Sequence, residues 1–347
     1  MTRKLAKIEP NAEIVEQNLV NELSALIEKS KRSVGMYANA MTALVFWQIG
    51  KRINDIILQN KRAEYGKQIV VTVSRQLQER HGRSFEEKNL RRMMQFAEQF
   101  TDKQIVVTLS RQLSWSHFVV LITLKSDAEK QFYIKESIAN YYGVRELRKQ
   151  IELKAYERNK IADTQISKSA IIPQNTFKDP YIFDFLELKN AYSENDLETA
   201  IIRELESFIL EFGKGFAFVE RQKRMIIDGE DFYLDLLFYH RTLKRLVAVE
   251  LKIGKFQAKF KGQMELYLKW LNRYEKQDGE NMPIGLILCT EGNREQIELL
   301  EMHKDGIMVA EYLTQLPPKK EFEKKIHSLL LEAREKLEKR QLIDRRG

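Results

Sequence analysis

Two acidic residues interrupt strongly apolar runs in the second half of the chain. Asp235 breaks the run 232–239, and Glu250 and Lys252 break the run 246–253. A charge inside a buried strand costs free energy unless it is paired or binds a cation. Side chains alternate across a strand, so Glu250 and Lys252 face the same side. If the two runs pair through the short basic connection between them, two carboxylates and an ammonium group converge at one point.

This combination predicts chemistry on phosphodiesters. Mg²⁺ is bound by one or two carboxylates together with waters and substrate phosphate oxygens. A metal there would activate a water and neutralise charge on the reacting phosphate, while Lys252 would hold the attacking water or stabilise developing charge. The triplet Glu-x-Lys occurs five times, but only the Glu250 copy lies in a β-branched apolar run that follows another acid-containing run. The alternative is a structural Glu–Lys pair on an edge strand with a solvated face.

The elements expected to position these residues are those of an α/β domain. Helices are predicted over 197–212, ending at Gly213, and over 257–274. Asp228-Gly229 is typical of a hairpin turn. Besides the two runs already named, strands are predicted at 216–219, 283–289 and 306–310, and a charged helix at 319–340.

The first half of the chain has helical periodicity throughout. Apolar residues recur at spacings of three and four in 14–27, and a second such run covers 34–58. Ser84 to Glu87 has the pattern of a capping box that opens a further helix, and Ser126 opens another. The segment 68–77 is nearly repeated at 104–113. Because solenoids need three or more units, this indicates a duplicated helix within one small all-α domain.

A helix-turn-helix is the interpretation we give to the segment 67–100. Its turn lies at His81-Gly82, and its second helix begins with four residues that suit DNA. Arg and Asn side chains contact base edges, and Lys contacts phosphates. The alternative is an ordinary pair of packed helices with a solvated basic face. The candidate nucleic-acid-binding residues are Lys88, Asn89, Arg91 and Arg92.

Charge is divided unevenly between the two halves. The 347 residues carry a net charge of +8. Residues 1–172 hold 29 Lys and Arg against 19 Asp and Glu, a net of +10, and the remainder carries −2. A basic module joined to a nearly neutral one is the expected arrangement. We place the helical domain at 12–162, a linker at 163–179 and the second domain at 180–335.

Composition also excludes several classes of protein. The single cysteine, Cys289, cannot form an internal disulfide or a multi-cysteine zinc site. Only 6 prolines and 15 glycines occur, against 43% hydrophobic residues, so the chain is not collagen-like or wholly disordered. No apolar run reaches the roughly 18 residues of a membrane-spanning helix, and residues 1–10 lack the apolar core of a signal peptide. We therefore expect a cytoplasmic protein with no membrane partner.

The spacing Asp235-x₁₄-Glu250-Leu251-Lys252 resembles the signature of the PD-(D/E)XK nuclease superfamily. Longer segments are similar to the YhcG-type proteins of bacteria that belong to this superfamily. The resemblance covers roughly residues 12 to 335. The segments that carry it are 213–219, 231–240 and 249–256 in the second half, and 88–93 and 112–117 in the first.

The resemblance implies roles for individual residues. Asp235 and Glu250 match the metal-binding acids, the main-chain carbonyl of Leu251 matches a further metal ligand, and Lys252 matches the catalytic lysine. The superfamily often adds a Glu on the first core helix, for which Glu198 is the first choice and Glu204 the alternative. A capping role for Glu198 is left open.

Three further residues follow the signature. Gln263 matches the position of a polar residue found in many superfamily members, and it could hydrogen-bond near the metal. Lys255 and Lys259 could bind phosphates, although a solvated helix end explains them equally well. The expected fold is two-domain: an all-α, helix-turn-helix-like first domain and a restriction-endonuclease-like αβ second domain with a central mixed sheet.

The function implied is a Mg²⁺-dependent endonuclease, with Mn²⁺ as a substitute ion, that hydrolyses DNA and acts in defence, recombination or repair. Its expected partners are nucleic acid, with DNA favoured, and a second copy of the chain by analogy. Two alternatives remain. One is a non-catalytic nucleic-acid-binding or assembly protein that keeps a nuclease fold, and the other is a structure-selective, junction-resolving nuclease that would need a dimer.

Overall fold

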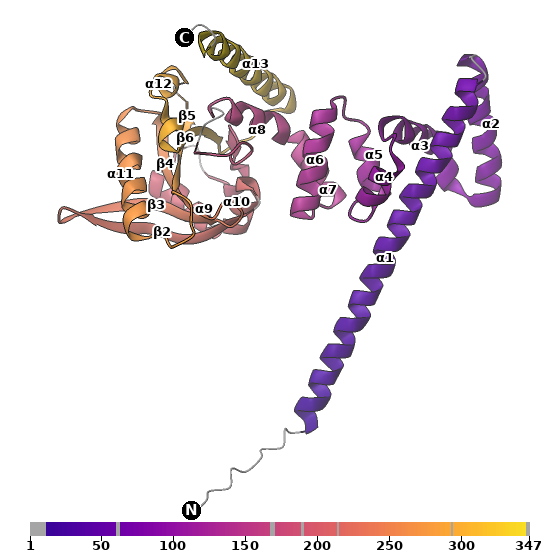
Figure 1. Ribbon diagram of the computed structural model, residues 1–347, viewed down its shortest axis with the longest axis horizontal. Coiled ribbons are helices and arrows are strands. Elements are labelled where there is room, and N and C mark those ends of the chain that lie inside the picture. Colours follow the sequence, from indigo (N-terminus) through magenta and orange to yellow (C-terminus); the bar gives the residue numbers. More distant parts are fainter. Residues whose placement is uncertain are drawn as a thin grey trace, which may run out of the picture. The chain divides into compact units, whose positions relative to one another are not determined.

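The chain divides into two compact units, residues 1–148 and 149–347. The structure is a computed structural model that describes residues 12–59, 63–166, 171–188, 191–213, 215–292 and 294–344 (Figure 1). Four residues of the predicted linker, 167–170, lie outside the described ranges. None of the described helices is long and apolar enough to cross a membrane.

The described part of the first unit contains helices and no strands, as the sequence predicts. The two periodic runs 14–27 and 34–58 belong to one helix of 48 residues, α1. The elements are α1 (Ala12–Gln59), α2 (Ala63–His81), η1 (Arg83–Phe85), α3 (Glu87–Gln99), α4 (Lys103–Ser110), α5 (Trp115–Leu121), α6 (Asp127–Asn140) and α7 (Val144–Glu152), the last of which crosses the unit boundary.

Capping differs from prediction at one of the two expected positions. Ser126 caps α6 by accepting from the Glu129 backbone N–H, as expected. The expected capping box at Ser84 is wrong, because residues 83–85 form a 3₁₀ turn and the N-cap of α3 is Glu86. This turn follows Gly82, whose φ of 91° suits glycine alone. The turn between α2 and α3 is therefore longer than the sequence pattern suggests.

The second unit is built on a mixed six-stranded sheet in the order β1-β6-β5-β4-β3-β2. The neighbours β2, β3 and β4 are antiparallel, and the remaining pairs are parallel. The predicted hairpin turn is confirmed, with positive φ at both Asp228 and Gly229. The strands are β1 (Tyr181–Ile182), β2 (Phe216–Ile227), β3 (Glu230–His240), β4 (Arg245–Lys255), β5 (Ile284–Glu291) and β6 (Ile307–Leu313).

Helices cover both faces of this sheet, which is why its central strands read as nearly continuous apolar runs. The predicted helix 197–212 is two helices that break at Glu204 and end at Gly213. The helices and turns of this unit are α8 (Ala155–Asp163), η2 (Asp184–Leu186), α9 (Glu194–Arg203), α10 (Leu205–Phe212), α11 (Lys259–Tyr274), α12 (Arg294–Leu299), η3 (Met302–Asp305) and α13 (Lys319–Asp344).

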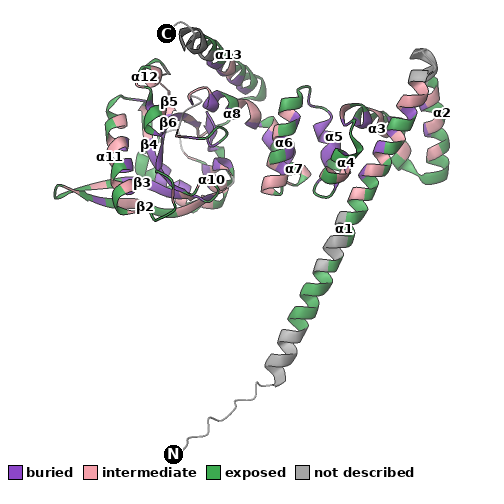
Figure 2. Cartoon of the chain, viewed as in Figure 1, coloured by how far each residue is buried: buried purple, intermediate pink, exposed green. Residues whose placement is uncertain are grey.

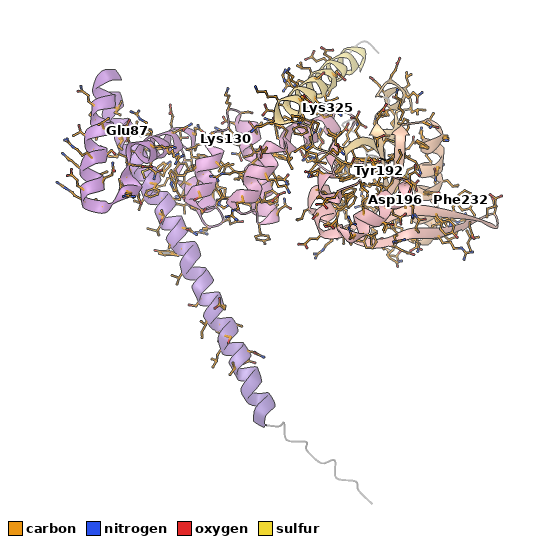
Figure 3. The ribbon with its side chains drawn as sticks, turned by 180° about the vertical axis from the view of Figure 1, so that it is seen from behind. Glu87, Lys130, Tyr192, Asp196, Phe232 and Lys325 are labelled. Carbon is orange, nitrogen blue, oxygen red and sulfur yellow. The ribbon has the colours of Figure 1, made fainter. Side chains whose placement is uncertain are left out.

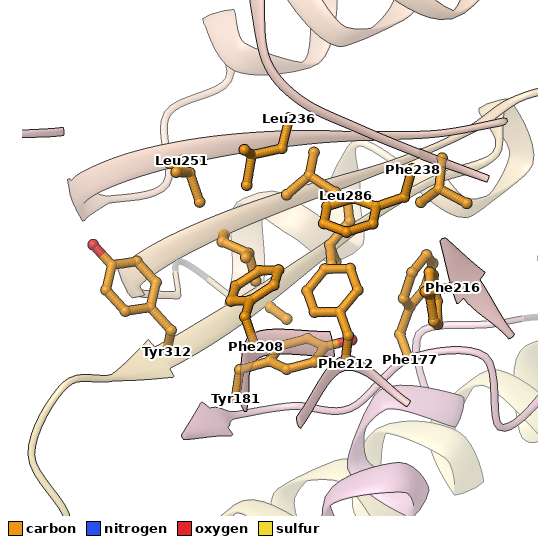
Figure 4. Packing of buried hydrophobic residues seen from close by; sticks show 14 of the residues in the cluster. Phe177, Tyr181, Phe208, Phe212, Phe216, Leu236, Phe238, Leu251, Leu286 and Tyr312 are labelled. Carbon is orange, nitrogen blue, oxygen red and sulfur yellow. The ribbon is translucent and has the colours of Figure 1, made fainter. Parts of the chain in front are cut away.

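Each face of the sheet has its own core. On one face Phe208 and Phe212 of α10 pack on Phe238, and Leu236, Val249 and Leu251 join the same cluster (Figure 4). On the other face α11 contributes Met264, Tyr267, Leu268 and Leu271, which pack on Ala248, Ile287 and Cys289. Different helices cover the two faces, so successive residues of β4 pack in different clusters.

A buried ionic cluster joins α8 to the nuclease-like sheet. Arg158 of α8 is fully buried and pairs with Glu211 of α10. The Glu211 carboxylate also lies 3.5 Å from Lys178 Nζ. It accepts a 3.0 Å hydrogen bond from the Ile182 N–H. Burial raises the pKa of Glu211, but Arg158 and Lys178 outweigh burial and lower it below its ordinary value. α8 therefore lies in the second unit, whereas the predicted domain limits place it in the first.

Glu211→Gln should destabilise the second unit by about 3–5 kcal/mol, because it leaves Arg158 buried without its counter-charge. Urea unfolding would measure the loss. Glu206→Gln, on the exposed side of the same helix, is the matched control and should change the free energy of unfolding by less than about 0.5 kcal/mol. Equal effects of the two substitutions would contradict the assignment.

Candidate active site

The candidate site begins where β3 and β4 stop pairing. Their antiparallel register runs from His240↔Arg245 to Leu236↔Val249 and ends there. β4 continues alone against β5, with Glu250, Leu251 and Lys252 opposite Ile287, Leu288 and Cys289. The Leu251 N–H has no β3 carbonyl opposite it and instead donates to Asp235 Oδ2 at 2.8 Å. The Asp235 carboxylate thus takes the place of the next rung of the ladder.

Glu250 and Lys252 lie on the same face of β4, as the alternation of side chains predicts. Lys252 Nζ is 2.8 Å from Glu250 Oε2, and only 2% of Glu250 is exposed. Gln263 of α11 reaches the same carboxylate, with its Nε2 at 3.5 Å from Glu250 Oε2. The amide of Gln263 also donates to Tyr267 Oη at 2.8 Å, which holds it over the site.

Glu198 reaches the site from α9 through a residue that the sequence did not indicate. Gln222 of β2 donates from its amide both to Glu198 Oε2 and, at 3.3 Å, to Asp235 Oδ1. Gln222 lies between the pairs Arg221↔Leu236 and Lys223↔Leu234, hence opposite Asp235, and has a φ of 49°. Such a backbone is uncommon for a residue other than glycine. No local pattern around Gln222 could have revealed this.

Glu198 has no capping role, because Ser193 and Asp196 form the capping box of α9. Its side chain is buried, with 3% exposed, and Arg221 Nε lies 3.3 Å from its Oε1. The alternative residue, Glu204, is at the break between α9 and α10 and pairs with its neighbour Arg203 at 3.3 Å. The structure therefore brings Glu198, and not Glu204, to Asp235.

A second residue that sequence reasoning missed, an acid, contacts the lysine. Glu194, the first residue of α9, has its Oε2 3.9 Å from Lys252 Nζ. Its Oε1 accepts a 3.2 Å hydrogen bond from the Ile253 N–H. Lys252 is thus placed between Glu250 and Glu194, with the ring of Phe260 5.6 Å away. Acidic residues are common in the first turn of a helix, so the sequence around Glu194 does not indicate a role in the site.

Comparisons with known proteins identify the family. Residues 174–327 match the model of the YhcG PDDEXK nuclease domain, and residues 22–158 match that of the DUF1016 N-terminal domain. The chain is 33% identical over 343 residues to the "Putative nuclease YhcG" of Escherichia coli (strain K12), covering 88% of this chain and 92% of that protein. The chain belongs to the YhcG family. Its two-domain fold class, helical followed by a restriction-endonuclease-like mixed sheet, is confirmed.

Two solved structures are similar to this YhcG-family chain over 38% of its length. One is a repair endonuclease from Pyrococcus abyssi, with 23% identity and a TM-score of 0.26, and the other is EndoMS in a complex with double-stranded DNA, with 20% identity and a TM-score of 0.27. The match spans about half the length of each of these proteins.

Of the remaining candidate residues of the YhcG-family chain, four lie on α3 in the first unit and two, Lys255 and Lys259, lie in the second unit. In α3, Arg91 forms a 2.6 Å ion pair with Glu87, which is labelled in Figure 3. Arg92 donates to Asn89 Oδ1 at 3.3 Å. In the second unit, Lys255 at the end of β4 pairs with Glu291 at 3.6 Å. The structure places Lys88 at the start of α3 and Lys259 at the start of α11.

Burial dominates the electrostatics of the three carboxylates. It raises the pKa of Glu198 and of Asp235, and it raises that of Glu250 to about 7, with a further contribution from the nearby Asp235 charge. For Lys252, burial lowers the pKa, but Glu250, Asp235 and Glu194 together outweigh it, so the net shift is upward. The lysine therefore remains an ammonium ion at neutral pH.

The site residues fit a hydrated divalent cation. Glu250 Oε1 is buried and accepts no hydrogen bond from any residue that the structure describes. In a strand the N–H and C=O of one residue point to the same side, so the Leu251 carbonyl is expected on the Asp235 side of β4. Within the described ranges, no three carboxylate, imidazole or thiol groups lie close enough to enclose a metal.

Without metal, the stability of the protein should fall as pH rises from about 5 to about 8. The raised pKa of Glu250 means that the folded state holds a proton that the unfolded state releases above its ordinary pKa of 4.5. The loss should reach up to about 3 kcal/mol. Unfolding free energies in EDTA at pH 5 and pH 8 would measure it.

Glu250→Gln is the matched variant for this measurement, since its amide does not titrate. The substitution removes the carboxylate that pairs with Lys252. Because Lys252 stays charged between pH 5 and pH 8, the cost of this loss is the same at both pH values. Its stability should thus decline less between pH 5 and pH 8 than that of the wild type. Parallel pH profiles for the two proteins would show that Glu250 ionises normally.

Proposed function

We propose that the second unit is a Mg²⁺-dependent endonuclease that hydrolyses DNA phosphodiester bonds. The observation that supports this most is the meeting of Asp235, Glu250 and Lys252 where β3 and β4 separate. Two carboxylates and an ammonium ion bury their charges there, which a purely structural role does not require. The family match to a PDDEXK nuclease domain agrees with the same reading.

Each residue has a distinct role in the proposed reaction. Asp235, Glu250 and the Leu251 carbonyl would hold the cation, which supplies a Lewis acid and an acidified water when bound. Lys252 would stabilise charge that develops on the phosphate oxygens, because its raised pKa keeps it protonated and unsuited to be a general base. Gln263 would orient Glu250, and Glu198 would bind a water of the cation.

Glu194 and Gln222 would act as positioning residues. Glu194 ties the start of α9 to β4 directly after Lys252, so the lysine is held between two carboxylates. Gln222 keeps Glu198 next to Asp235 although the two come from different elements. Neither side chain needs to touch the substrate for these roles.

Lys252→Ala should abolish Mg²⁺-dependent nicking of supercoiled plasmid, because the charge that develops on phosphate loses its ammonium partner. A loss of at least 100-fold is expected, similar to the removal of one preorganised donor at other enzymes. EDTA should have the same effect on the wild type, and Mn²⁺ should restore activity.

The matched control is Lys269→Ala, which removes an exposed lysine from α11 and should leave nicking unchanged. Binding without cleavage by the wild type on linear, single-stranded and branched substrates, in several divalent metals, would overturn the enzyme assignment. It would favour a nucleic-acid-binding protein that has kept a nuclease fold.

For the first unit we propose DNA binding through α3. The net positive charge of the first half of the chain supports this proposal. Lys88, Asn89, Arg91 and Arg92 lie on the helix that follows the turn at Gly82, in the position of a recognition helix. Lys255 and Lys259 would add phosphate contacts near the active site. The ion pair between Arg91 and Glu87 is exposed and therefore weak enough to open for a phosphate.

Arg91→Ala combined with Arg92→Ala should weaken DNA binding and reduce the slope of log K against log salt concentration by up to about 2, because two phosphate contacts are lost. Fluorescence anisotropy at a series of salt concentrations would measure the slope. Glu87→Gln frees Arg91 and should strengthen binding. An unchanged slope in the double variant would remove α3 from the DNA-binding surface.

A further inference from the structure

The first part of α1 has no cover from its own domain. Every side chain from Val20 to Asn39 whose exposure the structure describes is exposed, whereas Ala43, Trp47 and Ile53 further along the helix are buried (Figure 2). The exposed residues include large apolar ones, which a soluble helix does not normally leave in water. They are Val20, Leu23, Leu26, Ile27, Val34, Tyr37, Met41 and Val45.

Six of these eight apolar residues fall on a stripe with the spacing of a heptad repeat, which Ser30 and the half-buried Leu44 complete. Val20, Ile27, Val34 and Met41 are seven residues apart, and Leu23, Ser30, Tyr37 and Leu44 repeat at the same interval three residues later. We call these eight positions the α1 stripe. The repeat of 3.5 residues per turn is shorter than the 3.6 of a helix, so the stripe stays in contact only with another helix that supercoils around it.

The α1 stripe lies on roughly the opposite side of the helix from the face that packs in the domain. At 3.6 residues per turn, Ala43, Trp47 and Gly50 are about half a turn away from Ile27, Val34 and Met41. Met41 is exposed although Ala43, two residues later, is fully buried. The helices of the first unit that bury Ala43 and Trp47 pack on the opposite face of α1. These contacts therefore leave the α1 stripe uncovered.

We infer that the α1 stripe is the interface of a parallel homodimer, in which the same stripe of a second copy of this chain forms a two-stranded coiled coil. At one core position the stripe has β-branched Val20, Ile27 and Val34, which favours two parallel strands when Leu occupies the other core position. That other position is Leu at 23 and 44, Ser at 30 and Tyr at 37.

The stripe is also self-complementary. Its positions carry no charge, and the acidic residues Glu22 and Glu28 lie outside it, so pairing with an identical helix opposes no like charges in the core. Small residues flank it, namely Ser24 and Ala38 on one side and Ala40 on the other, which lets two helices approach closely. Two-fold pairing through one shared surface is the commonest form of oligomer. The inference does not depend on nuclease activity.

Leu23→Glu combined with Tyr37→Glu should convert the full-length dimer to a monomer in sedimentation velocity, with a dissociation constant at least about 100-fold higher. The matched control is Ala25→Glu combined with Asn39→Glu, which adds the same two charges at the same spacing on the opposite side of α1 and should leave the dimer intact. A wild type that is monomeric at all micromolar concentrations, or a stripe variant that remains dimeric, would overturn the inference.

Cross-linking gives a second measurement that needs no disruption of folding. Ser30→Cys introduces a thiol at a core position, and equivalent core residues of a parallel pair are within disulfide range. Oxidation should yield a covalent dimer, whereas Asn39→Cys on the opposite side should not. The native Cys289 is buried and does not interfere. Failure of Ser30→Cys to cross-link any faster than Asn39→Cys would contradict the parallel pairing.

Discussion

The second unit depends on one hydrogen bond that replaces a missing rung of the sheet. Beyond Leu236↔Val249 the strands β3 and β4 separate, and the Asp235 carboxylate accepts the Leu251 N–H that would otherwise lack a partner. An unpaired backbone N–H in a buried strand costs free energy, so the fold itself requires an acceptor at this point.

The charges at the site are stabilised as a group and not singly. Glu250 pairs with Lys252, Lys252 also contacts Glu194, and Gln222 links Glu198 to Asp235. Burial nevertheless raises the pKa of all three central carboxylates. The cation that we propose for this site would favour their charged forms and lower these pKa values.

Much of the second unit could be predicted because its signals are local. The hairpin at Asp228-Gly229, the end of α10 at Gly213 and the shared face of Glu250 and Lys252 follow from backbone geometry within a few residues. The break at Glu204 was missed, since both halves of the predicted helix keep the same apolar periodicity. The turn before α3 was read as a capping box because a 3₁₀ turn uses the same polar residues.

The sequence by itself determined the fold class, the shared face of Glu250 and Lys252 on β4, and the helical periodicity of the first half, because these depend on residue spacing along one element. Only the tertiary structure decided which residues from other elements complete the site. Glu194, Glu198 and Gln222 come from α9 and β2, and their approach depends on how α9 packs on the sheet and on the positive φ of Gln222. Contacts between distant segments are set by packing, which no local pattern encodes.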